Sequence, residues 1–234
     1  MATKASVKAA LKQYVDPEKA AFYPRFFKTG KGEYGEGDCF LGVTVPNQRK
    51  VAKQFKALSS DEVCKLLDDK HHECRLTALL ILVEQFRRAD KKERKRIFDL
   101  YFMKVDRINN WDLVDASAHK IVGPHLEDKS RSFLHNLAKT DHLWKQRIAM
   151  IATYHFIQQD DFQDTVKLSR YFLTHEHDLI HKASGWMLRE VGKRDKSVLK
   201  AFLDRHHKRM PRTMLRYAIE RLPDQRRKAY LKAR

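Results

Sequence analysis

The sequence contains few residues that end helices or form covalent cross-links. Only 8 glycines, 6 prolines and 3 cysteines occur among its 234 residues. Because glycine and proline interrupt helices, their scarcity favours long helices joined by short connections. The cysteines, Cys39, Cys64 and Cys74, form no CxxC motif and cannot all pair with one another. We therefore expect reduced thiols and a cytoplasmic location.

Long apolar segments are also absent. The longest apolar run covers residues 78–83, whereas a membrane-spanning helix needs ~18 apolar residues or more. Residues 1–6 lack the apolar stretch of a secretory signal. We therefore expect neither a membrane segment nor a signal peptide.

Acidic residues are too few to balance the basic ones. The chain has 48 Lys and Arg against 30 Asp and Glu, a net charge of +18, and a sequence pI near 9.8. Residues 205–234 contain eleven of these cations and only two acids, Glu220 and Asp224, and so hold half of the net charge, +9. Such an excess is typical of proteins that bind a polyanion, nucleic acid first and an acidic membrane surface second.

What the sequence does contain is a regular succession of amphipathic helices, with no segment that alternates at the period of a strand. The expected helices span residues 2–15, 17–28, 46–58, 60–68, 71–88, 90–107, 109–123, 129–140, 142–159, 161–174, 178–194, 195–210, 211–222 and 223–234. Between the second and the third we expect a loop, Gly30–Gly37, and an extended connector, Phe40–Pro46. The loop is too acidic, and its glycines are wrongly spaced, for a phosphate-binding loop.

Four of these helices share a similar pattern of eight residues. The octets begin at residues 75, 111, 147 and 183, a constant step of 36. A fixed step with alternating helices predicts an all-α fold, an α-solenoid of HEAT-like or armadillo-like antiparallel helix pairs. We expect one domain over residues 1–234, in which the second helix of each pair lines a concave basic groove.

The 36-residue step also aligns the unusual side chains. Positions zero, three, four and seven of the octets fall on one stripe of a helix. The stripe holds Trp111, Asp115, Arg147, Tyr154 and Trp186. Arg189 flanks the stripe, and Lys182 and Gln146 lie at its rim. These side chains should project onto one surface that is aromatic, basic and supplied with a single acid.

Each of these residues also has a structural interpretation. Aromatic side chains at helical spacing usually belong to the core, although Leu113, Ile148 and Met187 already occupy core positions of their helices. Asp115 could form a structural ion pair with Arg147. Asp112, three residues after an Asn, is best explained as support for the first turn of its helix.

Other motifs are weaker. The spacing of His175, His177 and His181 hints at a metal site, but no HExxH motif or cysteine accompanies them, so we expect no metal. The pairs His71–His72 and His206–His207 are expected on the solvated surface. GxSxG, GxGxxG and Walker motifs are absent, and we expect no cofactor.

Three motifs resemble the AlkD-type DNA alkylation-repair glycosylases, a family of HEAT-like repeat DNA glycosylases. They are Trp111-Asp-Leu-Val-Asp115, Trp144-Lys-Gln-Arg147 and Lys182-Ala-Ser-Gly-Trp186-Met-Leu-Arg189-Glu190. The segment Asp16-Pro-Glu-Lys19 and the connector from Phe40 to Arg49 are also similar to that family. The resemblance therefore spans nearly the whole chain, with the central motifs in matching order and spacing.

The resemblance implies a base excision repair enzyme. It would hydrolyse the N-glycosidic bond of cationic N3- and N7-alkylpurines, such as 3-methyladenine and 7-methylguanine, in double-stranded DNA, without a base-flipping pocket. Such an enzyme would act as a monomer, associated with the nucleoid when bound to DNA.

Individual roles follow from the same resemblance. Asp115 matches the catalytic carboxylate, and Trp111 and Trp186 match aromatics that pack against the deoxyribose of the lesion. Arg147 matches a residue that holds the adjacent backbone, and Arg189 matches a further DNA contact. Phe26 stands where a related enzyme has Tyr, which would remove a hydroxyl contact to DNA.

The chemistry is coherent with these roles. A cationic alkylpurine is already a good leaving group, so no general acid is needed. The sugar carbon gains oxocarbenium character as the bond breaks, and one carboxylate can stabilise that charge and orient a water. Aromatic faces also favour a cationic sugar. No lysine stands out as a Schiff-base nucleophile, so we expect monofunctional hydrolysis without strand cleavage.

Two alternatives remain open at this stage. The first is a non-catalytic HEAT-repeat protein that binds distorted or branched DNA, which an Asp115→Asn variant distinguishes because only an enzyme would lose base release. The second is a protein-binding scaffold, which would have no affinity for DNA at moderate salt.

Overall fold

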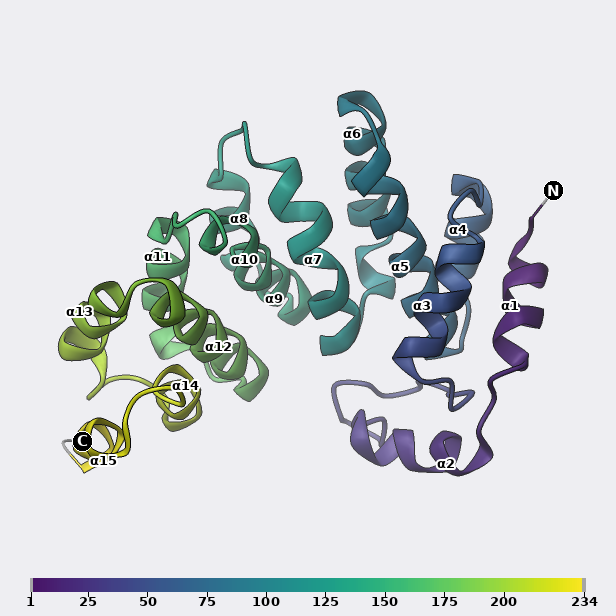
Figure 1. Ribbon diagram of the computed structural model, residues 1–234. Coiled ribbons are helices and arrows are strands. Elements are labelled where there is room, and N and C mark those ends of the chain that lie inside the picture. The colour runs from purple at the N-terminus through teal and green to yellow at the C-terminus, as the bar shows by residue number, and fades with distance from the viewer. Residues whose placement is uncertain (1, 233–234) are drawn as a thin grey trace. The chain divides into compact units, whose positions relative to one another are not determined.

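The computed structural model describes residues 2–232, and the regular elements of this part of the chain are helices (Figure 1). Its extended segments meet at one isolated parallel bridge, between Cys39 and His71. The all-α prediction is therefore confirmed, and the succession of helices is consistent with a helical-repeat solenoid. No helix within residues 2–232 is long and apolar enough to cross a membrane.

The chain divides into two compact units, Met1–Ile121 and Val122–Arg234. The first contains α1 (Lys4–Lys12), α2 (Pro17–Phe26), α3 (Val45–Gln54), α4 (Ser60–Leu67), α5 (His72–Arg88), α6 (Lys91–Met103), the 3₁₀ turn η1 (Val105–Arg107) and most of α7 (Trp111–His125). The second contains α8 (Ser132–Ala138), α9 (Leu143–Ala152), α10 (Tyr154–Ile157), α11 (Gln163–Tyr171), the 3₁₀ turn η2 (Phe172–Thr174), α12 (Asp178–Arg194), α13 (Lys196–His206), α14 (Arg212–Ala218) and α15 (Asp224–Lys232).

Helix α5 is the central element of the first unit. Helices α3, α4 and α6 each pack against it, and its apolar side chains from Leu76 to Leu82 are buried. The first turn of α5 is different, because His72, Glu73 and Arg75 are buried as well. Buried polar groups need partners, so this turn must be tied to other segments. Glu73 accepts hydrogen bonds from the amides of Leu41, Gly42 and Val43, and thereby fixes the connector before α3.

Helix α12 has the same place in the second unit, where α9, α11, α13 and α14 pack against it. The contact with α14 depends on Gly185. A Cβ atom at this position would lie 2.5 Å from the carbonyl oxygen of Met214 and 2.6 Å from the Cβ of Tyr217. The absent side chain therefore lets the two helix backbones approach closely.

Most helix starts follow the capping residues in the sequence. Asp16 accepts hydrogen bonds from the amides of Glu18 and Lys19, with Pro17 in the first turn, and Ser59, Asp90 and Asp195 cap α4, α6 and α13 in the same manner. Residues 30–37 form the expected loop, in which Gly32 and Gly37 have positive φ angles.

Two expected helices are interrupted. The helix expected over 142–159 is divided into α9 and α10 at Thr153, whose hydroxyl donates to the carbonyl of Met150 at 2.7 Å. A threonine side chain that bonds to the preceding turn competes with the helical ladder and bends it. The helix expected over 90–107 ends at Met103 and continues as η1.

Candidate functional site

Trp111 lies at the first position of α7 and rests on aromatic side chains of the first unit. Its ring stacks on Phe27, with centroids 5.5 Å apart and planes at 21°, and meets the edge of Phe26 at 5.8 Å. Phe26 is 50% exposed and Trp111 is half-buried. Two of the predicted site residues, from α2 and α7, are thus brought into contact at the surface.

Asp115 lies one turn further along α7 and is half-buried. Its neighbour is the buried Tyr101 of α6, whose hydroxyl is 3.0 Å from the hydroxyl of Ser117. Burial raises the pKa of Tyr101, and the negative charge of Asp115 raises it further. Asp115 and Trp111 therefore share one side of the first two turns of α7, as their spacing predicts.

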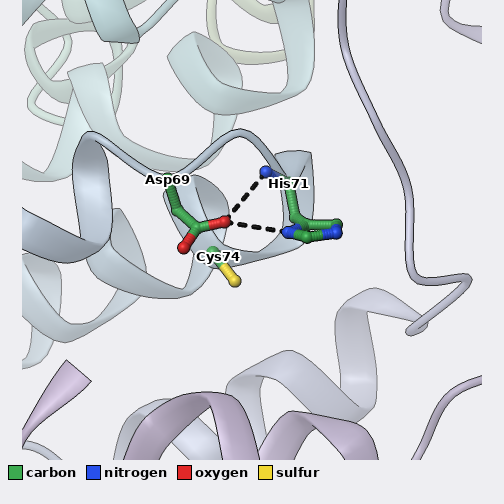
Figure 2. Close-up of side chains that lie close together, drawn as sticks. All are labelled: Asp69, His71 and Cys74. Carbon is green, nitrogen blue, oxygen red and sulfur yellow. Dashed lines mark hydrogen bonds and ion pairs between the residues drawn. The ribbon is translucent and has the colours of Figure 1, made fainter. Parts of the chain in front are cut away.

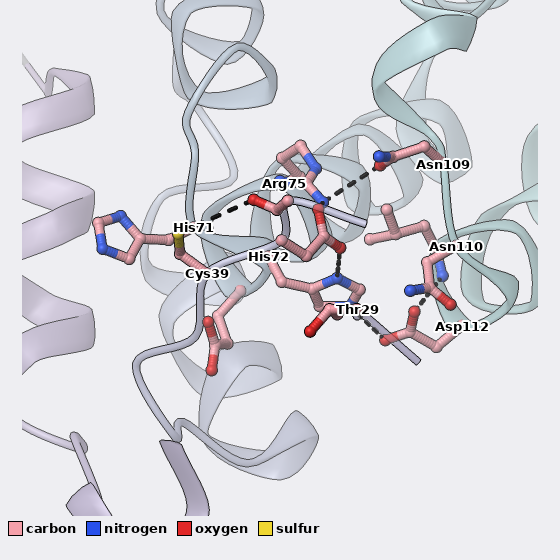
Figure 3. A network of polar contacts seen from close by, with 12 residues as sticks. Thr29, Cys39, His71, His72, Arg75, Asn109, Asn110 and Asp112 are labelled. Atoms are coloured by element: carbon pink, nitrogen blue, oxygen red, sulfur yellow. Dashed lines mark hydrogen bonds and ion pairs between the residues drawn. The ribbon is translucent and has the colours of Figure 1, made fainter. Parts of the chain in front are cut away.

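A network of buried polar groups lies at the start of α7 (Figure 3). His72 Nε2 is 2.8 Å from Asp112 Oδ2, and His72 Nδ1 is 2.9 Å from Asp38 Oδ2. Only 2% of His72 is exposed. The prediction that His72 lies on the solvated surface is therefore wrong, because two carboxylates remote in the sequence give the ring buried partners.

The network continues to Arg75, whose Nη2 donates to Asp38 Oδ1 at 2.6 Å and to Asn109 Oδ1 at 3.1 Å. Asp112 also accepts the amide of Leu113 at 2.9 Å. The first-turn role predicted for Asp112 is thus present, and its second oxygen binds His72 in addition.

Opposite charges in this network stabilise the charged forms of His72 and Asp38, as the pKa of each group shows. Burial alone lowers the pKa of His72, but the charge of Asp112 and the hydrogen bonds to Asp112 and Asp38 outweigh it and raise the pKa to about 9. Burial alone raises the pKa of Asp38, but the hydrogen bond from His72 and the charge of Arg75 outweigh it, so this pKa is lowered. At neutral pH the network therefore contains an imidazolium.

In the second unit, Trp186 and Arg189 meet at Glu190. The indole Nε1 of Trp186 donates to Glu190 Oε1 at 3.1 Å, and the ammonium of Lys193 lies 2.8 Å from both carboxylate oxygens. Arg189 is 3.4 Å from Glu190 and forms a second ion pair with Glu220. Glu190, which is 7% exposed, was not predicted as a site residue.

The other predicted residues of the second unit have partners within the protein. Arg147 is only 4% exposed, and its Nη1 donates to the carbonyl of Leu179 at 2.5 Å, which joins α9 to α12. Gln146 Nε2 donates to the carbonyl of Thr140 at 2.8 Å. Lys182 is 2.8 Å from Asp178, and Tyr154 is half-buried at the start of α10.

The three histidines with metal-like spacing form hydrogen bonds within the chain. His175 Nε2 is 2.9 Å from Gln146 Oε1, and His181 Nε2 bonds to the carbonyl of His175. His177 Nδ1 accepts the amide of Leu179 at 3.1 Å and so caps α12. Burial lowers the pKa of both His175 and His177, which favours the neutral ring that this cap requires.

Within residues 2–232, one group of side chains has the spacing of metal ligands: Asp69, His71 and Cys74 (Figure 2). The carboxylate of Asp69 is already bonded to His71 at 2.9 Å, to Lys8 at 2.8 Å and to Lys4 at 3.0 Å. Burial raises the pKa of the Cys74 thiol to about 12. The bonds from Asp69 to Lys4 and Lys8 join α1 to the turn before α5, so the carboxylate acts as a structural clasp.

The chain is similar to a known protein family and to solved structures. The family model described as DNA alkylation repair enzyme matches residues 7–222. Among solved structures, the chain is similar to a predicted DNA alkylation repair enzyme from Enterococcus faecalis, with 18% sequence identity and a TM-score of 0.68 over 90% of this chain and 97% of that chain. At this identity the likeness shows a common fold. A comparison with curated proteins finds no match.

Proposed function

This chain belongs to the DNA alkylation repair enzyme family, and from that premise we propose that it is a monofunctional DNA glycosylase. Its substrates in this proposal are cationic N3- and N7-alkylpurines in double-stranded DNA, among them 7-methylguanine and 3-methyladenine. The observation that carries the proposal is the pairing of Asp115 with Trp111 on one side of α7, where neighbouring aromatic rings hold the Trp111 ring.

In the proposed reaction, the bond between the sugar and the alkylated base breaks and the electron pair leaves with the base. The base is neutral once it has left, so it needs no proton from the enzyme. Asp115 stabilises the positive charge that develops on the sugar and orients the attacking water, which adds to the sugar, loses a proton to Asp115 or to solvent, and yields an abasic site. The face of Trp111 favours the cationic sugar over the neutral one.

The remaining predicted residues are proposed to contact DNA around the lesion. Trp186 would pack against the deoxyribose, and Arg189, Lys182, Gln146, Tyr154 and Phe26 would contact the surrounding strand. Arg147 is buried in the free chain and bonded to the carbonyl of Leu179, so its guanidinium would have to become accessible before it could hold a phosphate. Arg189, whose side chain is 18% exposed, already pairs with Glu190 and Glu220, and a phosphate would compete with these carboxylates for its donors.

The test is product analysis after incubation with a methylated duplex. We expect free 7-methylguanine and 3-methyladenine, and a strand that stays intact until alkali cleaves it at the abasic site. Binding to the duplex without release of any base would overturn the enzyme and favour a non-catalytic protein for distorted DNA. Absence of binding at moderate salt would favour a protein scaffold.

A further inference from the structure

We propose that His72 is a positioning residue of this site: clamped as an imidazolium between Asp38 and Asp112, it fixes the first turn of α7 and thereby the orientation of Trp111 and Asp115. The inference rests on the proposed glycosylase function for its consequence in catalysis. The proposal that His72 holds the start of α7 in place does not depend on that function.

Both ring nitrogens of His72 face a carboxylate, so both must donate a hydrogen bond. His72 lies within hydrogen-bond distance of a carboxylate oxygen on each side, at 2.9 Å for Asp38 and 2.8 Å for Asp112. A carboxylate only accepts, and a neutral imidazole has a single N–H. A neutral ring would therefore leave one of the two carboxylates facing a lone pair, whereas an imidazolium satisfies both.

The network around His72 contacts the chain at two positions, one before α7 begins and one in its first turn. Asp112 belongs to the first turn of α7, and Asn109 precedes the helix and accepts from Arg75. Both Asp112 and Asn109 are thus tied to the first turn of α5 through the same network (Figure 3). This arrangement restrains the direction in which α7 leaves the preceding turn.

Aromatic rings also connect His72 to the ring of Trp111. His72 packs against Phe27 at 4.8 Å and Phe40 at 5.1 Å between centroids, and Phe27 in turn stacks on Trp111 at 5.5 Å. The position of Trp111 therefore depends on His72 both through the backbone of α7 and through a stack of rings.

Stability alone does not explain such a network. Burying charged groups is costly, and well-packed apolar residues in their place are often as stable or more so. The charged groups that face the His72 ring are Asp38 from the segment before the connector, Asp112 from α7 and Arg75 from α5 itself, while Phe27 and Phe40 are uncharged. Directional bonds among these groups specify one geometry for the start of α7.

The experiment compares wild type with His72→Gln, whose neutral side chain cannot donate along both directions of the ring. Single-turnover release of 7-methylguanine, affinity for the same duplex without lesions, and hydrogen exchange of the amides of residues 111–115 are measured together. We expect release to slow by about 10- to 100-fold, as for a small misplacement of reacting groups. Duplex affinity should not change, and exchange at the start of α7 should become faster.

A pH profile separates positioning from mere folding. Wild-type release, corrected for spontaneous depurination, should decline as the pH rises through about 9, where His72 loses its proton. His72→Gln should lack this decline. The matched control, His206→Gln on α13, should behave as wild type in every measurement.

Wild-type rates of release and exchange in His72→Gln would overturn the proposal, and so would a loss of release matched by an equal loss of duplex affinity. If wild type releases no alkylpurine, the proposed function fails. Hydrogen exchange alone then tests whether His72 holds the start of α7 in place. Unchanged protection of the amides of residues 111–115 in His72→Gln would contradict that role.

Discussion

The nearly buried carboxylate of Glu190 accepts hydrogen bonds from the indole of Trp186 and from the ammonium of Lys193. At the residue scale, one tryptophan of the proposed site, Trp186, is thus bonded directly to an acid. Asp112 is related to Trp111 only through other groups, because it binds His72 and accepts the amide of Leu113 in the turn that Trp111 begins. The ring of Trp111 itself rests on Phe26 and Phe27.

Replacing Glu190 with Gln tests this relation. The amide oxygen can still accept from Trp186, but the negative charge that pairs with Lys193 and Arg189 is lost. We expect the free energy of unfolding to fall by about 1–3 kcal/mol, the usual cost when a buried group loses charged partners. Chemical denaturation measures it, with the exposed Glu176→Gln as control. Equal stability of the two variants would show that Glu190 has no such role.

The sequence predicted the spacing of Trp111 and Asp115 but not the polar groups around them. Trp111 and Asp115 fall on one side of a helix because helical spacing is local, and both lie in the first two turns of α7. The contacts of His72, Asp38 and Glu190 were missed because they depend on neighbours that only the tertiary fold supplies. One signal was available: His72, Glu73 and Arg75 stand in the first turn of a helix whose next residues are mostly apolar, and Arg75 occupies the same repeat position as Trp111 and Arg147.

At the element scale, helix starts were predictable and close helix contacts were not. A capping side chain such as Asp16 or Asp195 bonds to amides two or three residues away, so the sequence alone identifies it. The division at Thr153 and the contact at Gly185 depend on what packs alongside, which repeat spacing does not reveal.

Gly185→Ala should destabilise the second unit. The new Cβ would meet the backbone oxygen of Met214 at 2.5 Å, so α14 must move away from α12. We expect a loss of about 1–3 kcal/mol from overpacking, although alanine is intrinsically the better helix former. The control is Gly30→Ala in the exposed loop, where the new Cβ would meet only the flexible Glu33 side chain, with its carboxylate oxygen at 3.0 Å; this variant should be near neutral. Thermal melts of the two variants that coincide would contradict the expectation.

At the scale of the whole molecule, the excess of basic residues determines how binding should respond to salt. The net charge of +18 predicts that affinity for any duplex is largely electrostatic. If about 6–10 phosphates are contacted, affinity should fall by about 10³–10⁵ between 50 and 200 mM salt. A titration of fluorescent duplex at several salt concentrations measures the slope. An affinity independent of salt would show that the basic residues do not bind the backbone.

Stability should also depend on pH through His72. Its pKa is raised from 6.5 in the unfolded chain to about 9 in the fold, so its contribution is complete below pH 6.5 and disappears as the pH rises through 9. The free energy of unfolding should therefore fall by up to about 3 kcal/mol across this range, and His72→Gln should lack the fall. Denaturant titrations at pH 6.5, 8 and 9.5 compare the two, and parallel curves would contradict the assignment.

Asp115 is proposed to stabilise the sugar as a cationic base departs, and single-turnover release of 7-methylguanine by Asp115→Asn tests this role most directly. Loss of a preorganised charge in the transition state should slow release by about 10²–10³ while duplex affinity stays at the wild-type value. The matched control is Asp99→Asn, whose carboxylate is exposed on α6 and pairs with Lys95; it should release base at the wild-type rate. Release by Asp115→Asn at that same rate would contradict the account.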